Sequence, residues 1–339
     1  MLDCQAVRPI VPRVFLPIVA LVLCGSAHQA PLRWSAVLGQ PRAWYATAEA
    51  RAVAEAVLLY QRASGGWPKD LDMTKPPAAA SSKLGDATID NGATTTQIRL
   101  LALVAEQVAP RDAARYRAAI GRGLEYLVRA QYPNGGWPQI YPVRTDYSRY
   151  ITFNDNAMTN VIDLLEEVSG GTAPFSFVDA DRRRRASTAV ERGVTVVLKT
   201  QVRVEGVLTA WCAQYDEVTL EPRPARSFEP AALTASESVG IVRTLMRREP
   251  DPDIVLSVDA AVEWFKRVRL ADGRWARFYE SKTNRPIFAG RDGIVRYTVD
   301  EIERERREGY AWFGTWPGRL VERDYPAWKT RVNGRDAAR

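Results

Sequence analysis

Three polar clusters in the sequence hold the residue types from which a site for an anionic ligand could be built. They occupy residues 88–97, 151–158 and 223–238, each just before a segment with helical periodicity. Asp and Asn are good helix N-caps, so capping alone could explain any one cluster, but it explains their density poorly. If these helix starts meet, Asp90, Asp155 and Arg226 reach one ligand. Several carboxylates with amide oxygens suit Ca²⁺ better than Mg²⁺.

A basic and aromatic group lies farther along the chain, at residues 288–297 and 306–317, and includes Arg296 and Arg307. The fork of an arginine binds a carboxylate through two hydrogen bonds, and nearby aromatic rings can stack on sugars. Alternatively, the aromatic residues close the last helical hairpin against the first while the arginines form structural ion pairs. The residues alone leave both interpretations open.

The histidine and cysteine content excludes several kinds of catalytic site. His28 is the one histidine of the sequence, so a Ser-His-Asp triad, a Cys-His pair and a His-ligated zinc or iron site are all excluded. The cysteines are Cys4, Cys24 and Cys212. We expect Cys212 to pack as a small apolar residue.

Residues 1–27 have the layout of a secretory signal peptide. Arg8 and Arg13 precede an apolar run over residues 14–24, and a cut after Ala27 would follow small residues. The run is too short to span a membrane. Lipidation of Cys24 is the weaker alternative, because Leu23 is not small. We therefore expect a secreted protein, extracellular or periplasmic, with no membrane association after cleavage.

The mature chain remains basic. The net charge of +7 falls to +6 when two leader arginines and one leader aspartate are removed. Basic exported proteins often meet a polyanion such as nucleic acid, an anionic surface or an acidic polysaccharide. Charge alone does not choose among them. Four arginines at residues 182–185 are expected to form a solvated helix face.

A repeat of about seventy residues organises the chain. Gln61 precedes a Gly-Gly-Trp-Pro loop at residues 65–68, and Gln131 precedes a second copy at residues 135–138. Gln201 with Trp211 marks a third copy, and residues 272–275 a faded fourth. Each loop follows a helical segment, and the first three also precede one. We expect Gly-Gly to make the reversal and each tryptophan (Trp67, Trp137, Trp211) to fill the gap between hairpins.

Such hairpins predict an all-α fold, an α/α toroid of the incomplete (α/α)3 type with long loops at the mouth. The predicted organisation is a signal peptide (residues 1–27), a single catalytic domain (residues 28–325) and a C-terminal tail (residues 326–339).

These motifs together resemble the family 10 pectate lyases. The matching stretches run in order over residues 64–69, 89–97, 134–139, 151–158, 211–215, 225–229, 236–240 and 309–317. One Gly-Gly-Trp-Pro loop would be a weak signal, but the ordered set covers nearly all of the mature chain. The resemblance implies anti β-elimination on polygalacturonate, giving 4,5-unsaturated products, with Ca²⁺ and basic side chains neutralising the C6 carboxylate.

The resemblance also assigns roles to residues of this sequence. Arg226 matches the position of the catalytic base, Asp155 matches a calcium-ligand position, and Asp90 matches a carboxylate that helps to hold the metal beside the scissile sugar. An arginine is normally always protonated, so a basic role requires burial and surrounding positive charge to favour loss of its proton. Arg223 is the competing candidate for the base.

Further residues are expected to bind the substrate. By the resemblance, Arg296 and Arg307 would hold substrate carboxylates, and Asn91 and Lys69 are additional candidates. Because few carboxylates lie at the mouth, we expect substrate to complete the calcium site. We expect the protein to act as a monomer.

Two other functions remain as alternatives. A glycoside hydrolase on the same scaffold could use a pair of carboxylates from Asp90, Asp155 and Glu237, and it would work without calcium. A non-catalytic protein that binds acidic polysaccharide would use the same arginines and aromatic rings. No nucleic-acid-binding module is recognisable, so nucleic acid is not expected as a partner.

Overall fold

The structure is a computed structural model that describes residues 32–78 and 84–336. The predicted signal peptide, His28 and two of the three cysteines lie outside the described residues. Within the described residues, no helix has the length and apolar character that crossing a membrane requires.

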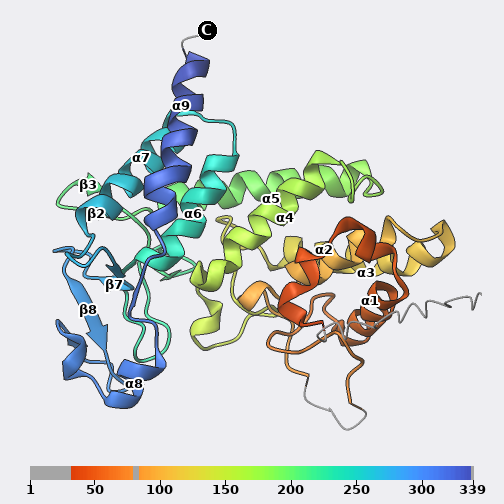
Figure 1. Cartoon of the computed structure of the whole chain (residues 1–339), viewed down its shortest axis with the longest axis horizontal. Coiled ribbons are helices and arrows are strands. Elements are labelled where there is room, and N and C mark those ends of the chain that lie inside the picture. Colours follow the sequence, from red (N-terminus) through yellow and green to blue (C-terminus); the bar gives the residue numbers. More distant parts are fainter. Residues whose placement is uncertain (1–31, 79–83, 337–339) are drawn as a thin grey trace, which may run out of the picture. The chain divides into compact units, whose positions relative to one another are not determined.

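Helices dominate the described part of the chain, as the sequence predicts (Figure 1). The α-helices are α1 (Ala48–Tyr60), α2 (Thr95–Ala105), α3 (Pro110–Ala130), α4 (Ala157–Gly170), α5 (Ala180–Lys199), α6 (Ala235–Arg247), α7 (Pro252–Arg267), α8 (Arg304–Gly309) and α9 (Tyr325–Asp336).

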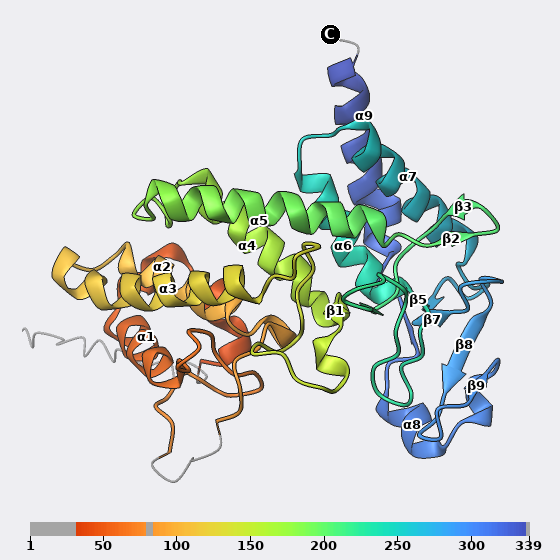
Figure 2. The same ribbon diagram turned by 180° about the vertical axis from the view of Figure 1, so that it is seen from behind.

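The helices form two rows in contact with each other. Helices α1, α3, α5 and α7 each precede a Gly-Trp loop, and each touches the next of its row. Helices α2, α4 and α6 follow the first three loops, and α4 touches both α2 and α6. Figure 1 and Figure 2 show α3 beside α2 and α5 beside α4. This alternation of outer and inner helices is the arrangement that the repeat predicts.

Short strands add to the helices and depart from the all-α expectation. They are β1 (Ile151–Thr152), β2 (Arg203–Val204), β3 (Val207–Leu208), β4 (Gln214–Tyr215), β5 (Leu233–Thr234), β6 (Trp275–Ala276), β7 (Phe278–Tyr279), β8 (Pro286–Ala289), β9 (Val295–Arg296) and β10 (Phe313–Gly314). The largest sheet is antiparallel, in the order β5-β7-β8-β9, with Leu233 opposite Tyr279 and Phe278 opposite Ile287. Strands of two to four residues are too short to produce a readable alternation in the sequence.

The repeated tryptophans are structural, as predicted. Trp67, Trp137, Trp211 and the fourth-copy Trp275 are fully buried. Each indole N–H donates a hydrogen bond of 2.7–2.8 Å to a carbonyl near the end of the preceding outer helix. These carbonyls lie among the last four of their helices, where partners within the helix run out, so the buried ring helps to satisfy a helix end while it fills the gap between hairpins.

The repeated glutamines tie each loop to the next outer helix. In each copy, the side-chain amide donates one hydrogen bond to a loop carbonyl and another across to the following helix. The acceptors in that helix are the carbonyls of Ala119 for Gln61, Ala189 for Gln131 and Ser257 for Gln201, at 2.8–2.9 Å. At Gly65 (φ +103°) a Cβ would lie 2.4 Å from the carbonyl oxygen of Arg122, so this close approach requires glycine.

Backbone hydrogen bonds bring the starts of α2, α4 and α6 next to one another. The N–H groups of Thr88, Thr152 and Thr234 each donate to the carbonyl of the tryptophan in their own repeat. The residue after each threonine donates its N–H to a backbone carbonyl of the following repeat, two positions after the tryptophan there. The pairs are Ile89 to Gln139, Phe153 to Ala213 and Ala235 to Arg277. The polar clusters before α2, α4 and α6 therefore lie next to one another.

Most of the segment predicted to be a C-terminal tail, residues 326–339, is helical. Residues to Asp336 form α9, with Trp328 and Val332 buried. Tyr325 donates a hydrogen bond of 2.9 Å to Asp259 of α7, and Lys329 pairs with the same carboxylate. Pro326 is the second residue of α9 and directly follows the π-helical turn Leu320–Asp324, whose wider hydrogen-bond pattern accommodates a residue without an N–H.

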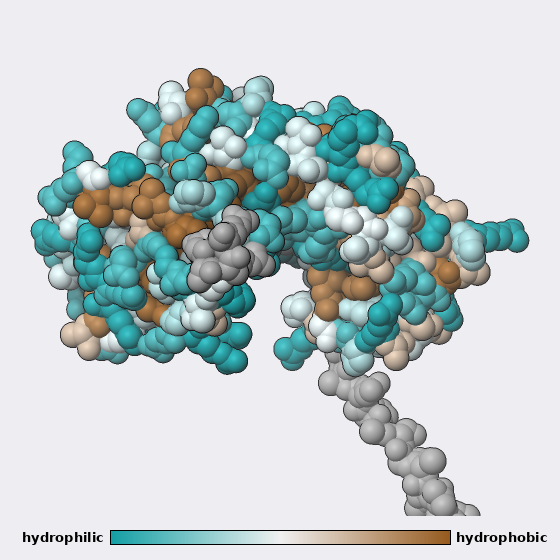
Figure 3. All heavy atoms as spheres, turned by 90° about the horizontal axis from the view of Figure 1, so that it is seen from above, coloured by the Kyte–Doolittle hydropathy of each residue, from teal (hydrophilic) through white to brown (hydrophobic). Residues whose placement is uncertain are grey.

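Polar side chains cover most of the face shown in Figure 3, with small hydrophobic patches between them. Cys212 is buried, and burial raises the pKa of its thiol to about 12. The thiol is therefore protonated and unreactive at neutral pH, which confirms that it packs as an apolar residue.

Candidate active site

Two short 3-10 turns lead the chain into the inner helices α2 and α4. They span Asp90–Gly92 and Asn154–Asn156, and their middle residues have left-handed backbone conformations, with φ of +51° at Asn91 and +49° at Asp155. Asn and Asp tolerate this conformation better than other residues with a side chain. The local backbone thus explains why amide and carboxylate residues stand at both turns.

The first turn holds a neutralised carboxylate. Asp90 is 2% exposed and pairs with Lys69, which comes two residues after Trp67. Burial alone would lower the pKa of Lys69, but the hydrogen bond and charge of Asp90 outweigh it and raise that pKa. The Asn91 amide donates a hydrogen bond of 2.8 Å to Asp70. Three residues predicted to bind substrate or metal (Asp90, Asn91, Lys69) therefore lie together.

The second turn holds a carboxylate that is not neutralised. Asp155 is exposed as a residue, and its carboxylate accepts a hydrogen bond of 2.7 Å from the Asn154 amide. Partial desolvation first, then the charges of Glu237 and Asp90, raise the pKa of Asp155, although Arg277 acts against them. The proton is therefore held more tightly than by an ordinary aspartate, as expected for a partly desolvated carboxylate beside other carboxylates.

A buried ion pair stands beside this carboxylate. Glu237, 4% exposed, accepts hydrogen bonds from the hydroxyls of Thr234 and Ser236 and pairs with Arg277 at 2.7 Å. Burial would lower the pKa of Arg277, but Glu237 and further neighbours, Asp155 among them, raise it. Arg277 was missed in the sequence analysis, although it stands two residues after Trp275, as Lys69 stands two residues after Trp67.

Arg226 is held by a buried glutamate three residues later. Its Nε donates to Glu229 Oε2 at 2.8 Å, its second guanidinium nitrogen bonds Oε1, and the Tyr310 hydroxyl donates to Oε1 at 3.0 Å. Glu229 is 6% exposed, whereas the Arg226 side chain is 49% exposed. The hydrogen bond that Arg226 donates to Glu229 raises the pKa of Arg226. The sequence did not reveal that Glu229 opposes the loss of a proton from Arg226.

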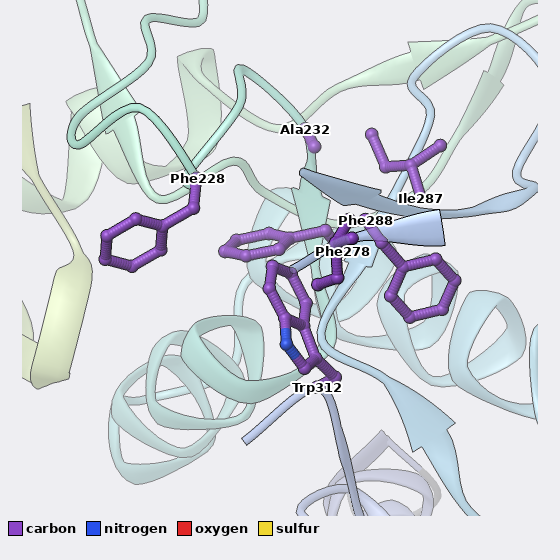
Figure 4. Packing of buried hydrophobic residues seen from close by; sticks show 7 residues of the cluster. Phe228, Ala232, Phe278, Ile287, Phe288 and Trp312 are labelled. Atoms are coloured by element: carbon purple, nitrogen blue, oxygen red, sulfur yellow. The ribbon is translucent and has the colours of Figure 1, made fainter. Parts of the chain in front are cut away.

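An aromatic cluster supports the segment that presents Arg226. Phe228, Phe278, Ile287, Phe288 and Trp312 belong to it, and Figure 4 shows Phe278 packed against Trp312. The Phe228 ring lies under two guanidinium groups, 4.7 Å from Arg226 and 4.6 Å from Arg306. The Phe228 ring and the Glu229 carboxylate together hold the guanidinium of Arg226 in place.

The other predicted arginines have local partners. Arg296 pairs with Asp292 at 2.7 Å, and Arg307 contacts Asp300 at 3.3 Å. At the C-terminal motif, it is Arg306 that shares the Phe228 ring with Arg226. Arg223, the alternative base, pairs with Asp216 at 2.9 Å.

The mouth cluster, as we call these central residues, has an excess of negative charge. Its members are Lys69, Asp90, Asp155, Arg226, Glu229, Glu237 and Arg277, four carboxylates against three cations. Among the described residues, however, no three acidic, His or Cys side chains come together as a metal site. Oxygen donors with surplus negative charge fit Ca²⁺ chemically, but a bound ion would need further ligands from elsewhere.

Comparisons with known proteins agree with this arrangement. The model of the family described as pectic acid lyase matches residues 61–274 and 271–321. The structure is similar to the family 10 polysaccharide lyase from Cellvibrio cellulosa, with 35% identity, a TM-score of 0.74 and coverage of 84% of this chain and 95% of that one. The structure is also similar to an aspartate-to-alanine mutant of that lyase in complex with trigalacturonic acid. The identity is 34%, the TM-score is 0.74, and the match covers 84% of this chain and 96% of that one. No curated protein sequence matches the chain.

Proposed function

Because the chain belongs to the pectic acid lyase family and is a pectate lyase, we propose that it cleaves polygalacturonate by calcium-assisted anti β-elimination, with Arg226 as the base. The observation that supports this best is that Asp155, which has no ion pair within the described residues, interacts with Arg277 and Glu229, and Glu229 in turn holds Arg226. The similar lyase from Cellvibrio cellulosa has been obtained with trigalacturonic acid, which is a fragment of this polymer.

Asp155 is the proposed calcium ligand, with Asp90 close enough to contribute once substrate is bound. Bound Ca²⁺ would supply positive charge beside the C6 carboxylate and so acidify the C5 proton. Asp155 and the surplus negative charge of the mouth cluster fit this ion, and the lack of a ready three-carboxylate site supports the expectation that substrate carboxylates complete it.

The basic side chains would orient and neutralise the sugar acid. Arg277 presents a buried guanidinium whose charge is only partly used by Glu237, so it can attract a substrate carboxylate. Lys69 and Asn91 are proposed to contact the neighbouring sugar from the first turn. Arg296 and Arg307 remain predicted carboxylate contacts, which would require them to exchange Asp292 and Asp300 for substrate.

Arg226 must lose a proton before it can remove one from C5. In the free protein, Glu229 stabilises the protonated guanidinium. Added positive charge beside Asp155 and burial under the sugar would both lower the pKa of Arg226. The proposal therefore requires that the base form only in the complex, and only at alkaline pH.

The remaining features extend this proposal to the whole chain. We propose that the two rows of helices make an α/α toroid, which would place the mouth cluster at one rim. We also propose that residues 1–27 direct export and that the mature protein is a monomer.

A direct test follows the ultraviolet absorbance of the unsaturated product. Purified protein is incubated with polygalacturonate at alkaline pH, with calcium or with excess chelator. Calcium-dependent absorbance is expected. It should be abolished in Arg226→Ala and strongly reduced in Arg226→Lys, because a lysine cannot keep both hydrogen bonds to Glu229.

The matched control is Arg223→Ala, which removes a nearby arginine paired with Asp216. Loss of activity in Arg223→Ala with full activity in Arg226→Ala would transfer the role of base to Arg223. Reducing ends released without absorbance would mean hydrolysis, and tight binding without any product would mean a non-catalytic protein. Either result would overturn the proposal.

A further inference from the structure

A cavity on the outer row of helices is separate from the mouth cluster. It has a volume of about 650 Å³ and lies between α3, the first Gly-Trp loop and the chain entering α5. Arg117, Arg122 and Arg129 of α3 and Arg182 of α5 line it. It shares no lining residue with the mouth cluster.

The cavity combines an apolar floor with a cationic rim. Ile120, Leu124 and Val178 are buried residues of the lining. The guanidinium of Arg117 lies 5.1 Å from the centre of the Phe177 ring. A sugar acid has matching parts, since its ring offers a C–H face to an apolar surface while its carboxylate accepts two hydrogen bonds from an arginine fork.

The arginines of the rim are incompletely neutralised. Glu125, the carboxylate of α3 that faces the cavity, pairs with Arg185 at 2.8 Å. Arg182 pairs with Asp179, its own helix cap. Within the described residues, Arg117, Arg122 and Arg129 have no ion pair with a carboxylate. Arg122 instead donates to the Gln61 side chain at 3.0 Å, and Glu125 acts on Arg129 through its charge alone. Arg117 and Arg129 are twelve residues apart, which is about 18 Å along an α-helix. The spacing suits a linear polyanion better than a single small anion.

We propose that this cavity is a second binding site for acidic polysaccharide, which holds one stretch of the polymer while the mouth cluster cleaves another. The identity of the polymer rests on the proposed function. A single strand of nucleic acid would need an open aromatic face for its bases. Phe177 is partly buried and covered by Arg117, so the surroundings favour the sugar acid.

A second site on the same molecule raises the local concentration of polymer at the first. Its loss should weaken the use of long substrates only, because a trisaccharide can occupy the mouth cluster by itself. This separates the second site from any residue of the catalytic machinery, whose loss impairs long and short substrates alike.

Two variants remove the site in different ways. Arg117→Gln with Arg129→Gln removes two positive charges of the rim that have no ion pair among the residues that the structure describes. Gly121→Gln places a side chain in the cavity without a change of charge. Gly121 is in the interior of α3, and a Cβ there would lie 3.9 Å from a guanidinium nitrogen of Arg182, an ordinary contact. Replacing a helical glycine also favours the helix, so the variant should fold.

The matched control is Arg267→Gln with Arg331→Gln, two exposed arginines on α7 and α9. Kinetics are measured on polygalacturonate and on trigalacturonate through the absorbance of the product. Both cavity variants should raise KM for the polymer about 3–10-fold, with kcat and all constants for trigalacturonate unchanged. The control should leave every constant unchanged.

Several results would overturn the proposal. Unchanged polymer kinetics in both cavity variants would do so, as would equal effects in the control or equal effects on trigalacturonate. If the wild type gave no product at all, the pectate lyase mechanism would fail separately. Retardation in gels that contain polygalacturonate would then still test the cavity. The cavity variants could be retarded less than the wild type in gels with single-stranded DNA but equally in gels with polygalacturonate. That result would identify a nucleic-acid site instead.

Discussion

The turns before α2 and α4 have the same backbone conformation, but their carboxylates have opposite surroundings. Both are 3-10 turns with a left-handed middle residue, tied by the same backbone hydrogen bonds to the Gly-Trp loops. In the first turn, Asp90 is buried and paired with Lys69. In the second turn, Asp155 lies among other carboxylates, and its pKa is raised.

The difference follows from the position that each carboxylate takes in the turn. Asp90 precedes the left-handed residue, while Asp155 is the left-handed residue and corresponds to Asn91. The repeat therefore supplies one scaffold with two uses. The first turn carries a carboxylate that is paired within the protein, and the second carries one without an ion pair in the described part of the chain, which is the proposed calcium ligand.

Asp155→Asn should have the largest effect on activity. Asparagine tolerates the same left-handed backbone, so the turn is kept while the charge is lost. The rate of elimination should fall about 10²–10³-fold, as expected when a group that positions transition-state charge is removed. The measurement is product absorbance over a calcium titration. Asp70→Asn is the control, and equal losses in both variants would remove the distinction between the turns.

Asp90→Asn should affect stability more than Asp155→Asn does. Loss of the buried carboxylate leaves the half-buried Lys69 with Asp70, at 3.6 Å, as its remaining ion-pair partner, which should lower the free energy of unfolding by about 1–3 kcal/mol. Lys69→Met added to Asp90→Asn should restore part of that loss. Urea unfolding of the two single variants and the double variant measures the coupling. Additive effects would mean that the ion pair does not stabilise the first turn.

The parts of the fold and of the candidate site that could be predicted from the sequence were those that recur with the repeat. The Gly-Trp loops and the inner-helix starts recur, so both rows of helices and the meeting of Asp90 with Asp155 were predictable. Glu229 was within a recognised motif, but its control of Arg226 depends on a geometry that spacing does not give. Arg277 pairs with Glu237 across 40 residues. The available signal was its place two residues after the tryptophan, which it shares with Lys69.

The C-terminal helix was missed for a different reason. Beyond the last copy of the loop no repeat guided the prediction, and Pro326 was taken as part of a tail. A proline inside a helical segment removes a backbone hydrogen bond, and here it follows a π-helical turn, Leu320–Asp324, which the sequence pattern does not reveal. The buried Trp328 was the stronger sign of packing.

Asn91→Asp tests whether position alone makes a calcium ligand. It places a carboxylate in the first turn where Asp155 stands in the second, but next to Asp70, which now accepts a hydrogen bond from Asn91. Repulsion between the two carboxylates should cost about 0.5–1 kcal/mol of stability. No gain in calcium affinity is expected, because Lys69 already supplies positive charge there. Calcium titration and urea unfolding would measure both effects, and tighter calcium binding would show that the first turn is equally suited to the ion.

The smallest expected effect is a gain in stability from Asp155→Asn. The pKa of Asp155 is raised above its ordinary value of 3.8, so the folded state binds the proton more tightly than the unfolded state. The ionised carboxylate therefore destabilises the fold above the folded-state pKa, and this penalty disappears below the ordinary value. In chelator at pH 7, Asp155→Asn should raise Tm by about 1–2 °C. The gain should vanish near pH 3. A lower Tm at pH 7 would mean that Asp155 stabilises its turn, as Asp90 does, and that the two turns do not differ in kind.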